Sequence, residues 1–439
     1  MNRLSGLVLL NTLVCGAATA AAQPARQESQ PQARVITVQD AIRLTLQHAP
    51  EVSLAVAQAT RASETVRETR SLNLPQITTG TGLAYNNGFP LSIEGAAPSI
   101  FEIGLSQPIF SKKNKNLILE AEQSSKAIQL GPEAARHELA AKTALVYYDL
   151  LQAHKLKNLW TDRLQAAVTD QQITENLLEA GKVRPLDVTL AQTATANARQ
   201  QVLVSDEQVK LTEAQLRDLT GIPESTPIQT AEPQIDGQLA DQSEDTIYAR
   251  ALETNPDVLQ AEANLQAKEF HVEAEKGDGL PRFDIISQYS LFSKTNNYQD
   301  FFKTFTRNNF IIGLSVQLPL FNGHRTSARV AQSQQEAAEA RFRLQRLKSD
   351  LKLGIGRALS ALRIARGAVD LAGREVATAR EVLQVNETLL QGGRISGREL
   401  ELARSQMREK EIAQLESQRA LFQREIELLK VSGTISSLF

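Results

Sequence analysis

Few side chains in this sequence are spaced for catalysis or metal binding. The run HELAA begins at His137 like the helix of a zinc protease, but Ala141 stands where the second histidine ligand belongs. The five histidines are scattered, and Met407 is the only methionine after Met1. GDGLP, at residues 277–281, reads as the turn into a strand and not as a phosphate-binding loop. The sequence therefore predicts no enzyme, no cofactor and no metal site.

Two carboxylates lie at equivalent places in two similar segments. LEAGKVRPLDVTLAQ contains Gly181 followed by Asp187, and LQGGRISGRELELAR contains Gly393 followed by Glu399. Each segment reads as a helix that ends at glycine, a short crossing, and a new helix that begins near the acid. An acid in the first turn of a helix caps free backbone N–H groups, and Ser396 with Glu399 has the spacing of a capping box. Helix capping is thus the first role predicted for Asp187 and Glu399.

These two segments belong to a chain that repeats its landmarks. Five landmarks recur in the same order at offsets of 206 to 212 residues. They are Pro50 with Pro256, Pro75 with Pro281, Pro108 with Pro319, Gly181 with Gly393, and Gly221 with Gly433. The offset increases by five between the second and third pairs, which predicts an exposed loop there because surface loops tolerate insertions. The sequence predicts two repeats, residues 36–237 with a hairpin tip at about 181–187 and residues 238–439 with a tip at about 393–399.

Residues 76–110 and 282–321 differ in composition from the rest of the chain. They hold 13 of its 21 aromatic residues but only eight of its 98 charged residues. Apolar residues alternate with small or polar ones in FEIGLSQ and NFIIGLSVQL, which is the period of a strand with one apolar face. Each repeat is therefore predicted to contain two strands of about ten residues joined by a polar loop. Their predicted bounds are about 76–86, 100–110, 282–292 and 309–319.

Much of the remaining chain reads as long helices that pack in pairs. Arg325 to Leu390 covers 66 residues without a proline, or roughly 100 Å of helix. Apolar residues recur every seven positions in two stretches, which is the spacing of a coiled coil. They are Val369, Val376, Leu383 and Leu390 on the outgoing helix and Leu415, Phe422 and Leu429 on the returning one. A helix of this length is stable only if it packs along its length.

The first repeat shows the same helical composition over residues 112–180. Gly131 and Pro132 interrupt it near its start, and a proline inside a helix removes a backbone hydrogen bond and clashes with the preceding turn. We expect a bend or break at this point, and the sequence alone leaves the continuity of the helix open. Shorter helices are expected before the strands, over residues 38–70 and 245–277.

The paired strands have two alternative interpretations. Ten-residue strands with one apolar face fit an outer-membrane barrel, and they also fit a soluble sheet that covers a core. Four strands do not close a barrel, and an open sheet edge is excluded inside a bilayer because its backbone groups find no water there. If the strands lie in a membrane, several chains must contribute strands to one barrel. The alternative is a soluble periplasmic coiled-coil scaffold with a small sheet.

The first residues predict export. Arg3 is followed by an apolar stretch and then by AAAQ, so residues 1–22 are expected to be a secretory signal peptide and residues 23–35 an N-terminal extension. Cys15 would suggest a lipid anchor, but Val14 precedes it where such sites have a small residue, so lipidation is not expected. No later segment approaches about 18 consecutive apolar residues. A formal net charge of −2 gives no indication of a nucleic-acid partner.

The order of these motifs resembles that of the TolC-like outer-membrane efflux ducts, over about residues 36–433. The resemblance rests on the duplication, on LP before each strand pair, on QPIF and LPLF after it, and on the two tips. At the tips this family has a glycine, a few residues, an acid with Val or Leu, and Ala-Gln, and Gly181 and Asp187 fit that pattern. The second tip departs from it at Gly397, where a bulkier residue is usual, and at Arg404, where glutamine is usual.

The resemblance implies a mainly α fold with a β-barrel. Three copies of the chain would form a twelve-stranded barrel and a long periplasmic α-barrel in the outer membrane of a Gram-negative bacterium. The implied partners are the other two copies of this homotrimer, outer-membrane lipid, a periplasmic adaptor (membrane fusion) protein and an inner-membrane pump. The implied cargo is drugs and other small toxic molecules. A type I duct that exports proteins is the alternative, because the pump selects the cargo.

Roles for the tip residues follow from the same resemblance. In this family the residues beside the tip glycines contact the adaptor, which implies that role for Gly181, Lys182, Val183, Gly393, Arg394 and Ile395. Threefold symmetry would repeat Asp187 and Glu399 around the narrow end of the pore, and rings of charge set ion selectivity. We therefore hypothesise that Glu399, with Asp187, forms a cation-favouring ring at a gated constriction.

Overall fold

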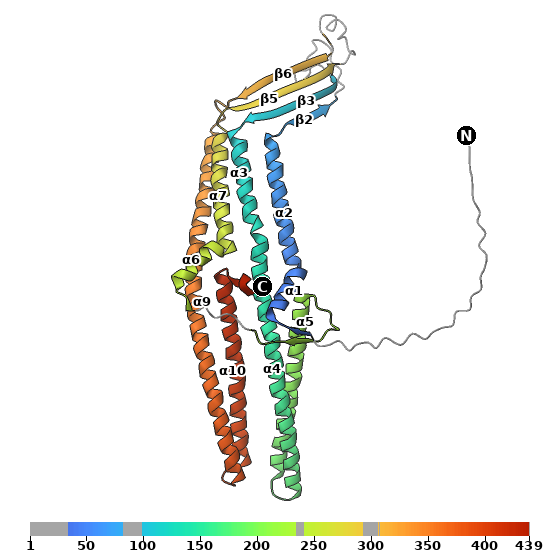
Figure 1. Cartoon of the computed structure of the whole chain (residues 1–439), viewed down its shortest axis with the longest axis vertical. Helices are drawn as coiled ribbons and strands as arrows, with labels where there is room; N and C mark the ends of the chain where they lie inside the picture. Colours follow the sequence, from blue (N-terminus) through green and yellow to red (C-terminus); the bar gives the residue numbers. More distant parts are fainter. Residues whose placement is uncertain (1–33, 82–98, 234–240, 293–305, 307, 439) are drawn as a thin grey trace, which may run out of the picture.

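The computed structural model describes residues 34–81, 99–233, 241–292, 306 and 308–438. The molecule is elongated, with a sheet at one end and the tips of two helical hairpins at the other (Figure 1). The expected signal peptide, most of the N-terminal extension and the two loops that join the paired strands lie outside the described residues.

The same order of elements occurs twice, as the repeated landmarks predict. The first series is α1 Val38–His48, α2 Pro50–Arg70, β2 Gln76–Gly80, β3 Ser99–Phe110, α3 Lys112–Gln129, α4 Gly131–Glu179 and α5 Pro185–Thr220. The second is α6 Glu244–Thr254, α7 Pro256–Gly277, β5 Arg282–Phe292, β6 Asn308–Gln317, α9 Arg325–Gln391 and α10 Gly397–Val431. The short elements are β1 Arg34–Ile36, β4 Ile228–Thr230, and the 3-10 helices η1 Ser71–Asn73 and η3 Ile435–Leu438. The bounds given above for the two repeats stay a prediction.

Proline divides the helical segment that precedes each strand pair. Pro50 and Pro256 each occupy the start of the second helix, where their missing N–H group is not needed. Ala49 and Asn255 before them are extended, as is usual for a residue that precedes proline. Each range expected to be helical therefore contains two helices and not one.

The long helix of the first repeat is interrupted at a single residue. α3 ends at Gln129 and α4 begins at Gly131, while Leu130 between them keeps helical backbone angles (φ −80°, ψ −14°). The Ala134 N–H donates to Leu130 O at 3.1 Å, so the next turn starts at once. Pro132 lies in the first turn of α4, where it is tolerated, and α4 continues in the general direction of α3 (Figure 1). The break expected at this point is confirmed, and it does not reverse the chain.

The longer strands form one antiparallel sheet in the order β2–β3–β5–β6. Its register pairs Glu102 with Ser290 and Ile103 with Tyr289, so side chains alternate between two faces. One face presents exposed apolar side chains: Ile77, Ile103, Ile285, Phe310, Ile312 and Leu314. The other face carries more polar groups, and there the Gln288 amide donates to Glu102 Oε1 at 2.6 Å. The two unlike faces are those that the period-two pattern predicts.

The observed strand ends differ slightly from the predicted ones. β5 has the predicted bounds, and β3 begins one residue before the predicted start. β6 ends at Gln317, two residues before the predicted end, because Pro319 cannot donate to a strand ladder. β2 ends at Gly80, and the predicted continuation beyond Thr81 lies outside the described residues.

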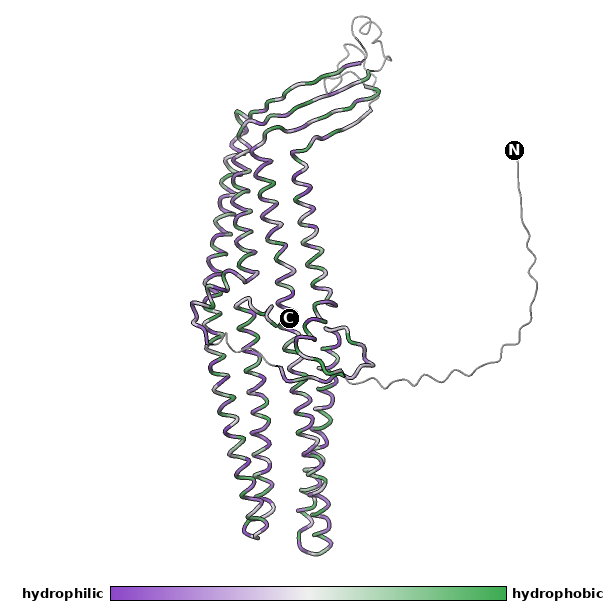
Figure 2. The backbone as a smooth tube through the Cα atoms, viewed as in Figure 1, coloured by the Kyte–Doolittle hydropathy of each residue, from purple (hydrophilic) through white to green (hydrophobic). Residues whose placement is uncertain are grey.

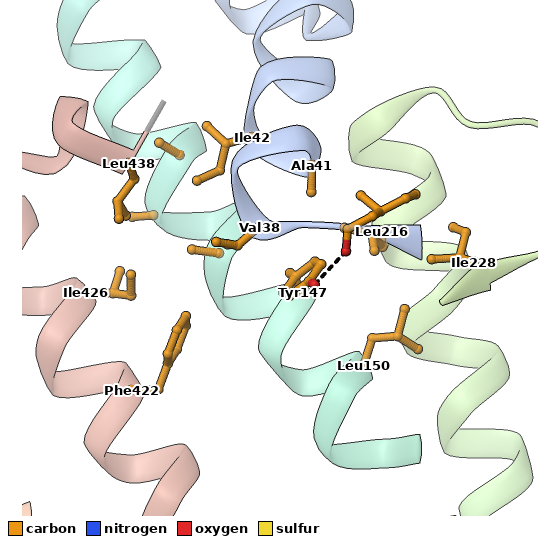
Figure 3. Close-up of a cluster of buried hydrophobic side chains, with 14 of the residues drawn as sticks. Val38, Ala41, Ile42, Tyr147, Leu150, Leu216, Ile228, Phe422, Ile426 and Leu438 are labelled. Atoms are coloured by element: carbon orange, nitrogen blue, oxygen red, sulfur yellow. Dashed lines mark hydrogen bonds between the residues drawn. The ribbon is translucent and has the colours of Figure 1, made fainter. Parts of the chain in front are cut away.

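The main hydrophobic core, drawn in Figure 3, contains residues of both repeats. It lies near mid-height of the molecule, at the level of α1 and the C-terminal end of α10 (Figure 1). Tyr147 of α4 is fully buried, and its hydroxyl donates to Ile36 O of β1 at 2.7 Å. The same hydroxyl accepts from the Ala231 N–H at 2.8 Å, just after β4. Apolar side chains from α1, α4, α5 and α10 surround it: Val38, Ile42, Leu150, Leu216, Phe422 and Ile426. This core fixes the place from which both hairpins extend.

Below the core, the chain extends as the hairpins α4–α5 and α9–α10, whose helices pack side by side. α9 is one helix of 67 residues, one more than predicted. Three residues of the seven-residue pattern are buried, Val376, Phe422 and Leu429. The other four are half-buried: Val369, Leu383, Leu390 and Leu415. Figure 2 shows hydrophobic and hydrophilic residues alternating along these helices, as expected of helices that pack through one side. Among the described residues, no helix is long and apolar enough to cross a membrane.

Candidate functional site

The first hairpin turns at Gly181, directly after α4. Gly181 has φ of +67°, a left-handed conformation that glycine adopts without strain. Its N–H donates to Leu178 O, and the Lys182 N–H donates to Leu177 O, both at 2.9 Å. This pair of hydrogen bonds is a Schellman motif, which satisfies the last free carbonyls of a helix.

The second hairpin turns in the same way at Gly393, directly after α9. Its φ is +68°, its N–H donates to Leu390 O, and the Arg394 N–H donates to Leu389 O, with both bonds at 2.9 Å. A Cβ added at Gly181 or Gly393 would meet no heavy atom within 4 Å. The backbone angle, and not crowding, therefore requires glycine at both tips.

Asp187 and Glu399 cap the helices that leave the tips. Glu399 Oε2 accepts from the Ser396 N–H at 2.7 Å and from the Ser396 hydroxyl at 3.0 Å. Ser396 Oγ in turn accepts from the Glu399 N–H at 3.4 Å, so the capping box expected from the sequence forms. Asp187 Oδ2 accepts from the Arg184 N–H at 2.9 Å, and the Arg184 guanidinium donates to both carboxylate oxygens at 3.3 Å.

These hydrogen bonds favour the charged form of both acids. The backbone N–H of Arg184, followed by its side chain, holds the pKa of Asp187 below its ordinary value. The backbone N–H and the hydroxyl of Ser396 lower the pKa of Glu399 in the same way. Both carboxylates are therefore ionised at neutral pH. The two acids differ in their surroundings. The Arg184 guanidinium forms an ion pair with Asp187, whereas no cation among the described residues pairs with Glu399.

The residues assigned to adaptor contact lie at the ends of the hairpins. Four are exposed and two are half-buried: Gly181, Lys182, Gly393 and Arg394 in the first group, Val183 and Ile395 in the second. Val188 and Leu400, each next to an acid, are buried and anchor the first turns of α5 and α10. Each tip is thus an exposed turn, and the helix that follows it is held by a buried apolar side chain in its first turn.

An arginine network joins the two hairpins near their tips. Arg404 of α10 donates to Asp170 Oδ2 of α4 at 3.0 Å and to Glu401 Oε1 at 2.9 Å. Arg163 of α4 donates to the other oxygen of Glu401 at 3.0 Å, and its side chain is only 11% exposed. The sequence singled out Arg404 as a departure from the family pattern but did not predict this network. The available signal was the seven-residue spacing of Arg163 and Asp170, which puts them on one face of α4.

Within the described ranges, no group of three or more His, Cys, Asp or Glu side chains could hold a metal ion. His137, the first residue of HELAA, is buried in α4, and its Nε2 lies 3.6 Å from Glu133 Oε1. Burial lowers the pKa of His137 against the opposing field of Glu133, so the ring is neutral at neutral pH. It is a packing residue of the helix.

Residues 41–222 and 247–434 match the sequence model of a family described as outer membrane efflux protein. Outer membrane efflux protein BepC of Brucella suis is 24% identical over 312 residues, which are 70% of this chain and 65% of that protein. Nickel-cobalt-cadmium resistance protein NccC of Alcaligenes xylosoxydans is 24% identical over 315 residues, which are 70% of this chain and 67% of that protein. The chain thus spans about two thirds of the length of these curated relatives.

The fold is similar to that of a solved channel. The CmeC outer membrane channel of Campylobacter jejuni superposes with a TM-score of 0.76 at 16% identity, over 90% of this chain and 85% of that one. At this identity the likeness bears on the fold alone. It confirms the expected architecture of one chain, in which long helical hairpins extend from a small sheet.

We expect the second tip to loosen in acid. The pKa of Glu399 is depressed in the folded chain, so its cap is fully formed above the ordinary value of 4.5 and is lost as the pH falls through the lower folded value. A spin label on Arg398→Cys, in the first turn of α10, should become more mobile in electron paramagnetic resonance spectra below about pH 4.5. Cys15, the other cysteine, lies in the expected signal peptide and would not compete for the label.

The control for this measurement is Glu399→Gln in the same labelled background. Glutamine keeps a neutral capping partner for the Ser396 N–H, so this variant should show little change with pH. An equally large change in the variant would mean that another group controls the tip.

Proposed function

The chain belongs to the outer membrane efflux protein family, and we propose on this basis that it is the outer-membrane channel of a tripartite efflux system. In this proposal it is a passive trimeric duct in the outer membrane of a Gram-negative bacterium. It carries small toxic molecules onward from an inner-membrane pump and a periplasmic adaptor, and the pump supplies the energy. Relatives named as outer membrane efflux protein and outer membrane channel support this assignment.

The observation that carries the proposal is an open four-stranded sheet with one apolar face. β2 and β6 end the strand order, and their outer backbone groups need partners inside a bilayer. Three copies would supply twelve strands, which exceeds the practical minimum of about eight for a barrel. The face that exposes Ile77, Phe310 and Ile312 would contact lipid, and the face that carries Glu102 and Gln288 would line the pore.

The helices would continue the barrel as a periplasmic tunnel. α9 has 67 residues, so it is roughly 100 Å long, about three times the thickness of a hydrocarbon core. The hairpin tips would then lie far from the outer membrane, within reach of an adaptor. The residues proposed for that contact are Gly181, Lys182, Val183, Gly393, Arg394 and Ile395.

Asp187 and Glu399 would lie around the narrow end of this tunnel. Three copies would repeat each ionised carboxylate three times, and a ring of negative charge favours cations. Arg404, bonded to Asp170 and Glu401, would hold the two hairpins of each chain together beside the ring. The ring and this network together are proposed to set the charge and the width of the aperture.

The number of chains tests the proposed function directly. Protein extracted from outer membranes in detergent should have the mass of three mature chains, measured by sedimentation equilibrium with the detergent subtracted. Three copies are expected because one sheet cannot close by itself. A soluble monomer obtained without detergent would overturn the channel, since the strands would then form a soluble sheet.

Removing the charge of Glu399 tests the aperture. In planar bilayers, Glu399→Gln should lower the single-channel conductance and reduce the preference for cations roughly two- to fivefold. The reason is that the substitution removes the three negative charges that Glu399 would contribute to the ring, one from each chain. Glu51→Gln is the matched control, because Glu51 is also an acid in the first turn of a helix but lies far from the tips. Unchanged conductance and selectivity in Glu399→Gln would remove Glu399 from the aperture.

A bulky residue at a tip glycine tests the adaptor contact. Gly393→Leu should abolish export, measured as ethidium accumulation in cells of the native host, while the mass in detergent stays that of three chains. Gly393→Asn is the first control. Asparagine adopts a positive φ more easily than leucine does, so this variant separates the effect of backbone strain from the effect of side-chain size. Gly397→Leu is the second control, because a Cβ there also meets open space but Gly397 has no positive φ. Normal export by Gly393→Leu, or equal loss in Gly397→Leu, would contradict the contact assigned to Gly393.

A further inference from the structure

Apolar side chains are exposed at the end of the sheet nearest the helices. Leu320 and Phe321, between β6 and α9, are 90% and 79% exposed. Phe110, the last residue of β3, is 54% exposed, and Leu74, just before β2, is 57% exposed. All four lie where the chain passes between a strand and a helix, which is one level of the molecule (Figure 1).

Basic residues lie at the same level. α3 begins with Lys112, Lys113 and Lys115, and α9 begins with Arg325 and Arg329. Neither helix has an acid in its first turn, whereas each of the other seven α-helices in the described part of the chain has at least one. Cations at this end of a helix oppose its dipole. A local rule broken in this way at two neighbouring helices indicates a surface with a function other than stability.

The starts of α3 and α9 meet at the end of α7. A Cβ on Gly277 would come within 2.6 Å of Lys113 N, so α7 and α3 approach closely there. Lys113 Nζ donates to Asp278 Oδ1 at 2.8 Å. A Cβ on Gly279 would lie 3.7 Å from Thr326 Cγ2, so the start of α9 is also near the end of α7. The pKa of Asp278 is lowered by Lys113 first, and by the charges of Arg325 and Arg329 after it.

Two other acids near this level are already paired, and a third, Glu275, is buried and its Oε2 has no hydrogen-bond partner among the described residues. Glu273 is shared by Lys276 at 2.7 Å and Lys112 at 3.5 Å, and Asp284 is paired with Arg282 at 2.8 Å. Three exposed basic side chains form no ion pair within the described residues: Lys115, Arg325 and Arg329. The surface therefore combines exposed apolar groups with an excess of positive charge.

We propose that this surface binds an anionic phospholipid in the leaflet of the outer membrane that faces the periplasm. The inference rests on the proposed function, since it takes the sheet to lie in that membrane. Leu320 and Phe321 contact the acyl chains, while Lys115, Arg325 and Arg329 attract the phosphate. A free phosphate ion would leave the exposed apolar side chains without a role, so a lipid fits both halves of the surface.

Native mass spectrometry of the detergent-extracted protein tests the lipid site. The unaltered protein should retain added phosphatidylglycerol in preference to phosphatidylcholine. Arg325→Gln with Arg329→Gln should reduce this preference roughly tenfold, because each basic residue near anionic lipid strengthens binding several-fold. The matched control is Arg343→Gln with Arg346→Gln, two exposed arginines on the same helix that lie roughly 27 Å farther from the sheet. It should keep the full preference.

The same spectra separate this inference from the proposed function. Assemblies of three chains that show no preference for phosphatidylglycerol, or the same preference in both double variants, overturn the lipid site and leave the channel standing. Bound inorganic phosphate without a lipid preference also overturns it. If the Arg325 and Arg329 variant does not assemble, the unaltered protein is titrated with salt. A preference that falls with ionic strength supports the site, and one that does not fall overturns it.

Discussion

In the proposed channel the sheet lies in a bilayer, where a backbone N–H or C=O group has no water to bond, and the rest of the molecule depends on that constraint. The four strands of one chain end at β2 and β6, so in the proposed channel the edges of its sheet would pair with those of other copies. Closure by copies would impose rotational symmetry on everything attached to the sheet, including helices roughly 100 Å long. The hairpin tips would become an aperture only through this symmetry, since one chain alone has two separate tips.

Within one chain, the two repeats are joined through β3 and β5, along α3 and α7 and, toward the tips, along α4 and α10. Along the seam of α4 and α10, apolar contacts lie at mid-height and ion pairs lie both there and near the tips. At mid-height Tyr148 stacks on Phe422 with the ring centroids 4.1 Å apart, beside the buried core. At the same level Arg419 pairs with Asp149 at 2.7 Å, and near the tips Arg404 pairs with Asp170 at 3.0 Å. Separating the apolar part exposes buried surface, whereas water can replace the partners of half-exposed ions. The seam therefore resists opening more strongly at mid-height than at the tips.

Features governed by local chemistry could be predicted from the sequence. Ser396 and Glu399 are three residues apart and form their capping box wherever the helix starts, and Gly393 marks a turn whose geometry only glycine adopts easily. The network around Arg404 could not be predicted in this way. Its partner Asp170 is 234 residues away in the sequence. The contact between them depends on how one repeat packs on the other. The predicted end of β6 was two residues too late. The apolar alternation continues to Leu318, but Pro319 already prevents further strand pairing.

Capping and aperture charge are compatible roles for the tip acids. A carboxylate fixed by its own backbone lies in one position, and because the hydrogen bonds depress its pKa it also stays charged. The two acids are nevertheless unequal. Asp187 accepts from the Arg184 guanidinium, so its charge is partly neutralised, whereas Glu399 accepts only from the uncharged Ser396 through one oxygen. The serine that replaces arginine at the second tip thus leaves Glu399 as the acid whose field reaches the surrounding water.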